Sequence, residues 1–76
     1  MSPGRLPMLK SKQVVKALLL LGFEEVRQSG SHIFFSHKDG RTTVVPLHGG
    51  EDVGRGLLRQ ILREINVTPE DFSTIV

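Results

Sequence analysis

The chain has 76 residues, a formal net charge of +2 and no cysteine. At this length folding buries only about 60–65% of the surface of the unfolded chain, so we expect one domain with a thin core. The absence of cysteine excludes a disulfide framework and any zinc site built on thiolates, and it fits a reducing cytoplasm. No apolar run approaches the roughly 18 residues that a membrane-spanning helix needs.

The positive charge is concentrated in the body of the chain. Residues 1–63 hold all 10 basic residues but only five of the eight acidic ones, and the other three acids lie in the tail. A basic body favours an acidic partner such as nucleic acid, although a net charge of +2 is too small to establish one.

The chain is predicted to begin with a disordered lead over 1–8, which contains two prolines and a glycine, followed by a single domain over 9–76. A helix is expected to follow Ser11 and to run to Leu21, because Ser11 is a good N-cap and Gly22 suits the left-handed position that ends a helix. Its apolar face consists of Val14, Ala17, Leu18 and Leu21. Its polar face holds Lys12, Gln13 and Lys16. Leu20 also falls on the polar side. It either lies at the edge of the core or forms a contact with a partner.

Three strands are predicted next, over 23–28, 32–36 and 41–45. Ser29 and Gly30 separate the first two as a turn. Asp39 and Gly40 predict a type I′ turn, which needs a positive φ at both positions. Pro46 should end the third strand, because proline cannot donate to a β-ladder.

After a loop over 47–53, a second helix is predicted over 54–65, with Asp52 as its capping residue. Its buried stripe consists of Leu57, Leu58, Ile61, Leu62 and Ile65. Another face carries Arg55, Arg59 and Arg63. Asn66 should end this helix, and Thr68 followed by Pro69 predicts a short third helix.

The order of helix, three antiparallel strands and helix predicts an α+β fold. Two amphipathic helices bury their stripes best side by side on one face of a three-stranded sheet, which leaves the other face open. Double-stranded-RNA-binding domains share this α-β-β-β-α arrangement.

His32 is the first candidate for chemistry, because it opens a strand directly after a glycine turn. It should share one side of that strand with Phe34 and Ser36, while Ile33 and Phe35 point the other way. If the latter two enter the core, His32 stands on the open face of the sheet, either as a functional residue or as an ordinary surface histidine.

The other candidates are weaker. His48 lies in a loop beside two glycines, and His37 is interpreted as a surface residue beside the hairpin turn. A metal site of the three histidines with Asp39 or Glu51 lacks the spacing of known motifs. A Ser31–His32 dyad is disfavoured, because adjacent strand residues point to opposite faces.

RNA cleavage requires few residues, because the ribose 2′-OH is itself the nucleophile. Histidine has an ordinary pKa of about 6.5 and can move a proton at neutral pH. Cationic groups must stabilise the phosphate. The candidate RNA-binding residues are Lys12, Lys16, Arg27, Lys38, Arg41, Arg55 and Arg59, although each could equally be ordinary solvated surface.

Several segments together resemble HicA-type toxins, the mRNA-cleaving components of toxin–antitoxin pairs. The match spans about residues 8–72. The matching stretches are Lys10-Ser11-Lys12, Leu21-Gly22-Phe23, Val26-Arg27-Gln28-Ser29-Gly30-Ser31-His32, His37-Lys38-Asp39-Gly40-Arg41, Val44-Val45-Pro46-Leu47-His48-Gly49 and Gly56-Leu57-Leu58-Arg59-Gln60-Ile61-Leu62. The sequence departs from the family's usual pattern at Leu47, Glu51 and Leu57.

The resemblance implies a double-stranded-RNA-binding-like fold and a metal-independent endoribonuclease that needs no cofactor. It implies a catalytic role for His32 and a possible assisting role for His48. The implied partners are mRNA and a HicB-type antitoxin, with no membrane, and we expect a monomer when the toxin is free.

Two other functions fit the same residues. A non-catalytic RNA-binding module would hold phosphates through Lys12 and Lys16 and through Arg55 and Arg59. A pure protein-interaction domain would use Leu20 and the open face of the sheet.

Overall fold

The computed structural model describes residues 8–47 and 52–76 of the chain. The expected lead over 1–8 lies outside the described residues except for Met8, which is exposed. The elements are β1 (Leu9–Lys10), α1 (Ser11–Leu20), β2 (Glu24–Ser29), β3 (His32–Ser36), β4 (Thr42–Pro46), β5 (Asp52–Val53), α2 (Arg55–Ile65) and α3 (Pro69–Ser73).

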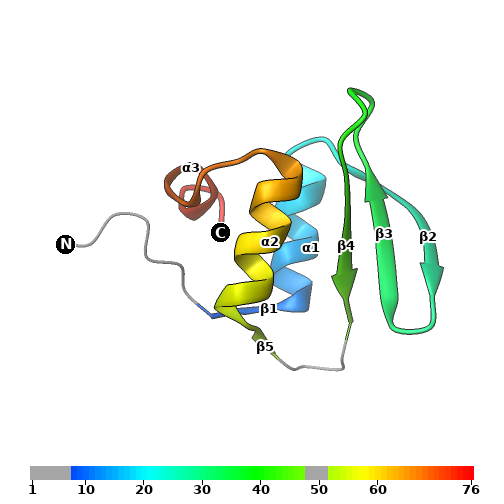
Figure 1. Ribbon diagram of the computed structural model, residues 1–76, viewed down its shortest axis with the longest axis horizontal. Coiled ribbons are helices and arrows are strands. Elements are labelled where there is room, and N and C mark those ends of the chain that lie inside the picture. Colours follow the sequence, from blue (N-terminus) through cyan, green and yellow to red (C-terminus); the bar gives the residue numbers. More distant parts are fainter. Residues whose placement is uncertain (1–7, 48–51) are drawn as a thin grey trace.

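The predicted α+β fold with a three-stranded antiparallel sheet is confirmed. The sheet has the order β2-β3-β4, and both α1 and α2 contact β4. Figure 1 shows β3 and β2 extending outward from β4, so β2 is the strand farthest from the helices. The core fills the space between the helices and one sheet face. Its buried side chains include Val14 and Leu18 of α1, Ile33, Phe35 and Val45 of the sheet, and Leu58, Ile61, Leu62 and Ile65 of α2.

The start of α1 differs from the prediction. Ser11 is the first helical residue rather than the N-cap, which is Lys10. The Gln13 side chain accepts the Lys10 backbone N–H at 2.9 Å and thereby satisfies one of the exposed donors at the helix start. The Ser11 hydroxyl instead donates to the carbonyl of Pro46, 35 residues away in sequence, at 2.8 Å. This tertiary bond replaces the local cap that the sequence pattern indicated.

A small second sheet joins the starts of α1 and α2. Leu9 pairs with Val53 and Lys10 with Asp52, and the Lys10 Nζ atom lies 2.9 Å from Asp52 Oδ1. Asp52 therefore does not cap α2, whose N-cap is Gly54. Two-residue strands carry no periodic signal, so the sequence predicted only a loop over 47–53.

The first hairpin has a two-residue loop of Gly30 and Ser31, shifted by one residue from the predicted turn. Ser29 pairs with His32 across the loop. Gly30 has φ of +59°, whereas Ser31 does not have a positive φ. This combination is typical of a type II′ turn, which has glycine at its first central position.

The second hairpin does not contain the predicted type I′ turn. The backbone N–H of His37 donates to the Arg41 carbonyl at 2.8 Å, and the backbone N–H of Gly40 donates to the His37 carbonyl at 2.9 Å. Gly40 has φ of +102°, but Asp39 has no positive φ. The loop therefore has three residues and a left-handed glycine, the second common hairpin geometry. Side-chain bonds favour it, because the Asp39 carboxylate accepts the Arg41 backbone N–H.

A cluster of four side chains connects this hairpin to α2, and its members are Phe23, His37, Asp39 and Arg41. His37 packs edge-on against Phe23 with ring centroids 5.1 Å apart, and only 15% of its side chain is exposed. The interpretation of His37 as a surface residue is therefore wrong. Arg41 lies over Phe23, pairs with Asp39 at 2.8 Å and donates to the Ile65 carbonyl in the last turn of α2.

The remaining helix ends agree with the prediction. Asn66 ends α2 in the left-handed conformation, with φ of 58°. Thr68 caps α3 by accepting the Asp71 N–H, with Pro69 as the first helical residue. Leu20 is 65% exposed and therefore does not contribute to the edge of the core.

Gly22 and Gly56 form a matched pair for testing the backbone. Gly22 has φ of +95°, and an added Cβ would lie 3.0 Å from His37 Nε2, whereas nothing lies within 4 Å of a Cβ at Gly56. We expect Gly22→Ala to lower the free energy of unfolding by about 1–2 kcal/mol. We expect Gly56→Ala, within a helix, to raise it by about 0.5 kcal/mol. Urea unfolding measures both changes in free energy. Equal effects of the two substitutions would contradict the conformations and surroundings described for the two glycines.

Asp39 should make stability depend on pH. The hydrogen bond from the Arg41 side chain holds the pKa of the Asp39 carboxyl below its usual value of 3.8. A lowered folded-state pKa adds stability above the unfolded-state pKa, and this stability is lost as the pH falls through the folded-state pKa. From pH 5 down to 2, the Tm of Asp39→Asn should therefore fall less steeply than that of the wild type. Glu24→Gln is the control and should retain the wild-type slope.

Candidate functional site

His32 occupies the position that the strand pattern predicted. It is the first residue of β3, the central strand, and it pairs with Ser29 on one side and Pro46 on the other. Ile33 and Phe35 are 5% and 1% exposed, so they face the core. His32 is exposed on the opposite face of the sheet.

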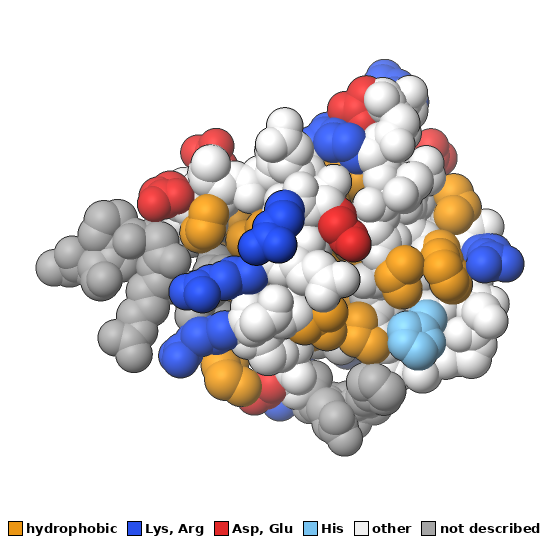
Figure 2. Space-filling view, in the orientation of Figure 1, with side chains coloured by type: hydrophobic (Ala, Val, Ile, Leu, Met, Phe, Trp, Pro, Cys, Tyr) orange, Lys and Arg blue, Asp and Glu red, His pale blue; other side chains and the backbone are white. Residues whose placement is uncertain are grey.

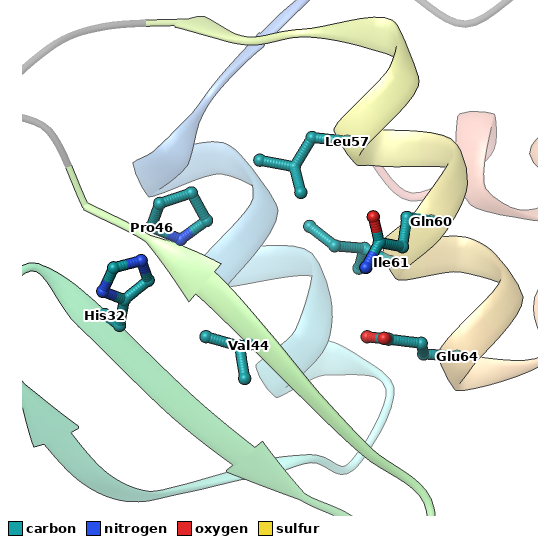
Figure 3. Close-up of a pocket in the computed structure, with 7 residues that line it drawn as sticks. All are labelled: His32, Val44, Pro46, Leu57, Gln60, Ile61 and Glu64. Carbon is teal, nitrogen blue, oxygen red and sulfur yellow. The ribbon is translucent and has the colours of Figure 1, made fainter.

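This face is not flat, because α2 rises beside β4 and forms the wall of a groove. The groove has a volume of about 330 Å³. Its lining residues are His32, Val44, Pro46, Leu57, Gln60, Ile61 and Glu64. Figure 3 shows His32 on the sheet side, the ring of Pro46 and side chain of Val44 in between, and Gln60 and Glu64 across from them on α2.

Gln60 and Glu64 are site residues that the sequence analysis did not identify. They lie one helical turn apart on α2, beside the groove-lining Leu57 and Ile61. Thr43 fixes the carboxylate by donating its hydroxyl to Glu64 Oε1 at 2.7 Å. The spacing of these residues on the helix was visible in the sequence, but nothing there indicated that this helix face adjoins His32.

Two hydrogen bonds hold the end of β4 that lines the groove. Ser11 is buried, and its hydroxyl bonds to the carbonyl of Pro46, the cross-strand partner of His32. The backbone N–H of Leu47 donates to the carbonyl of Ser31, in the turn directly before His32. These two bonds fix the backbone on both sides of the histidine. His48 follows next in the sequence but lies outside the described residues.

A β-bulge brings Arg27 to the same face as His32. Glu25 pairs with Phe35 but Arg27 pairs with Phe34, so Val26 is an extra residue in β2. Without it, alternation would turn Arg27 toward the helix side. The Arg27 guanidinium lies 4.4 Å from the ring centroid of Phe34. Together they give this face a cation stacked on an aromatic ring.

Comparison with known proteins decides the family. The family model described as the HicA toxin of bacterial toxin–antitoxin systems matches residues 11–67. The chain belongs to the HicA toxin family. It is therefore the toxin of a toxin–antitoxin system, and an antitoxin is its implied partner. No curated protein matches the chain as a relative.

The cationic residues of this toxin do not form one surface. Lys12 and Lys16 are exposed on α1, away from its buried Val14, Ala17 and Leu18. Because α1 packs on the helix side of the sheet, these lysines lie on the side of the toxin opposite His32. Figure 2 shows instead a row of cationic side chains along α2, on the same face as a histidine and a band of hydrophobic side chains.

The hairpin beyond β3 carries the other two predicted cations. Lys38 is exposed in the loop, at the opposite end of β3 from His32. The guanidinium of Arg41 is already bound by the Asp39 carboxylate and the Ile65 carbonyl. The structure therefore brings Arg27 to the face of His32 and Arg55 and Arg59 to the helix that walls the groove, but not the other four cations.

Two negative findings apply to the described part of the toxin. No group of three or more histidine, aspartate or glutamate side chains is placed there to hold a metal ion. No helix within 8–47 and 52–76 is long and apolar enough to cross a membrane.

Ser11 offers a test of how the groove end of β4 is held. We expect Ser11→Ala to lower the free energy of unfolding by about 1 kcal/mol, because the partly buried Pro46 carbonyl loses its donor. Ser73→Ala is the control, since Ser73 makes a similar bond at an exposed site. Urea denaturation measures both, and an equal cost for the two would show that the Ser11 bond is no more important than a surface one.

Proposed function

We propose that this toxin is an endoribonuclease that cleaves mRNA in the cytoplasm and uses His32 as its catalytic residue. The observation that carries the proposal is the exposed His32 at one side of a groove on the sheet face. A general acid or base must come within hydrogen-bond reach of the substrate, and the exposed side chain of His32 is accessible to a substrate that lies in the groove. The family match supports the same conclusion, because it establishes a toxin.

The proposed reaction needs no nucleophile from the protein. His32 accepts the proton of the ribose 2′-OH through an imidazole nitrogen, and the 2′-oxygen attacks the adjacent phosphorus. The bond from phosphorus to the 5′-oxygen breaks, and that oxygen takes up a proton from water, while the imidazolium of His32 later returns its proton to solvent. The products are a 2′,3′-cyclic phosphate and a 5′-OH. We also propose that His48 assists, and no metal ion takes part.

The RNA would be bound by cations on the face of His32 and along α2. Arg27 and Arg59, together with Arg55, supply positive charge for phosphates. The Arg27 guanidinium, stacked on the half-buried ring of Phe34, offers a flat surface on which an unstacked base can lie. Lys12, Lys16 and Lys38 remain candidates for more distant parts of the RNA. Arg41 is not included, because its guanidinium already has partners within the toxin.

The partner is proposed to be a HicB-type antitoxin that covers this groove, and the toxin is proposed to be a monomer when it is free. The groove has largely apolar walls, formed by Val44, Pro46, Leu57 and Ile61. Apolar surface with a polar rim suits a protein partner as well as RNA.

Replacement of His32 tests the proposed activity. His32→Asn should reduce RNA cleavage by at least about 100-fold, which is the usual contribution of a general acid or base. The fold should persist, because His32 is exposed and its side chain makes no hydrogen bond in the described part of the chain. Cleavage of a labelled single-stranded RNA measures the rate, and circular dichroism checks the fold.

Ser36→Ala is the matched control, on the same strand and the same face, and it should cleave at close to the wild-type rate. Equal cleavage by His32→Asn and the wild type would overturn the proposed role. Salt-sensitive RNA binding without cleavage by either protein would favour the non-catalytic RNA-binding module instead.

A further inference from the structure

We propose that the groove is a guanine-binding subsite in which Gln60 and Glu64 recognise the edge of the base. This inference rests on the proposed ribonuclease function and assigns it a substrate preference. The preferred cleavage site is the phosphate on the 3′ side of a guanosine.

The groove has the construction that a flat heterocycle needs. Val44 and Pro46 of the sheet face Leu57 and Ile61 of α2, so its walls are largely apolar. Its volume of about 330 Å³ falls within the range of about 300–1,000 Å³ typical of small-molecule pockets. A base can lie between these side chains with its faces against apolar atoms, and its edge then meets the polar groups at the rim.

The charge of Glu64 decides which part of RNA it can face. An ionised carboxylate only accepts hydrogen bonds, and it repels a phosphate. A carboxylate in the wall of the groove therefore disfavours binding of the RNA backbone alone. The partner that suits Glu64 is therefore an uncharged donor, and the donors of RNA are the base N–H groups and the 2′-OH.

Guanine fits this donor requirement better than the other bases. Its Watson–Crick edge presents two adjacent donors, N1–H and the 2-amino group, whereas adenine, cytosine and uracil each present donors at only one position. The Thr43 hydroxyl donates to Glu64 Oε1 at 2.7 Å and holds the side chain in place. Glu64 Oε2 and a second lone pair of Oε1 can therefore accept hydrogen bonds from a base. The Gln60 amide, one turn away, can donate to guanine O6.

The neighbouring side chains fit the same orientation of the nucleotide. At about 100° per residue, Arg59 and Arg63 lie on the solvent side of Gln60 and Glu64 around α2, opposite to Leu57 and Ile61. Phosphates can follow this cationic row while a base turns inward. Because the groove continues from Glu64 to His32, a guanine bound at α2 directs its ribose and 3′-phosphate toward the histidine.

The first experiment measures binding without cleavage. The His32→Asn protein is titrated with guanosine, inosine and adenosine 3′-monophosphates, and binding is followed by NMR and calorimetry. We expect the guanosine nucleotide to bind at least about tenfold more tightly than the adenosine nucleotide, within the range of one bidentate contact. Inosine, which lacks the 2-amino group, should be intermediate.

A second substitution assigns the preference to the carboxylate. Adding Glu64→Gln keeps an oxygen that can accept the Thr43 hydroxyl, so the fold should be maintained, and the ratio of guanosine to adenosine affinity should fall at least about fivefold. Glu70→Gln, on α3, is the control and should leave the ratio unchanged. Equal affinity for the two nucleotides, or a ratio unaffected by Glu64→Gln, would overturn the inference.

Cleavage by the toxin with His32 intact separates this inference from the proposed function. Single-stranded oligonucleotides with one guanosine among adenosines should be cut mainly after the guanosine. Equal cutting at every position would refute the guanine subsite and leave the ribonuclease in place. Selective guanosine binding that depends on Glu64, with no cleavage of any RNA, would support the subsite and refute the ribonuclease.

Discussion

The packing of α2 against β4 is the constraint on which the rest of this toxin depends. Leu58, Leu62 and Ile65 enter the core, so the rotation of the helix about its axis is fixed by burial. Once that rotation is set, the next positions around the helix, Leu57 and Gln60 among them, must stand beside the edge strand. The groove is therefore a consequence of how the core is filled, and no separate loop or insertion is needed to build it.

The two ends of the sheet differ in how their side chains are packed. At one end Phe23, His37, Asp39 and Arg41 join the hairpin to the last turn of α2 through stacking, an ion pair and a carbonyl hydrogen bond. At the other end His32 is exposed, and backbone bonds, the Ser11 hydroxyl and the Gln28 side chain hold its surroundings. One histidine thus packs against its neighbours, while the other has its side chain available to a ligand. Sequence spacing alone cannot distinguish the two, because both lie next to a hairpin.

The sequence predicted what local pattern and periodicity determine. Alternation along β3 placed His32 opposite the buried Ile33 and Phe35, and the stripe of α2 was correct because each of its residues is at least half-buried. The errors arose where tertiary partners decide. Ser11 bonds to Pro46 instead of capping its helix, and Asp52 pairs with Lys10. The one-residue bulge at Val26, which turns Arg27 toward His32, has no signature in composition.

Under the proposed function, the chemistry of the groove favours one form of RNA over the other. A duplex presents phosphates and 2′-hydroxyls to a protein and keeps its base edges paired, so it would meet Glu64 with like charge. The lysines of α1 lie on the far side of the sheet and cannot offset that repulsion at the groove. A single strand can instead unstack a base and lay it against apolar side chains, with Phe34 and Arg27 as a second surface for the next base. The proposed function therefore calls for an unpaired RNA, although the same arrangement of helices and strands serves duplex binding elsewhere, because α2 brings a carboxylate and an amide to the sheet edge.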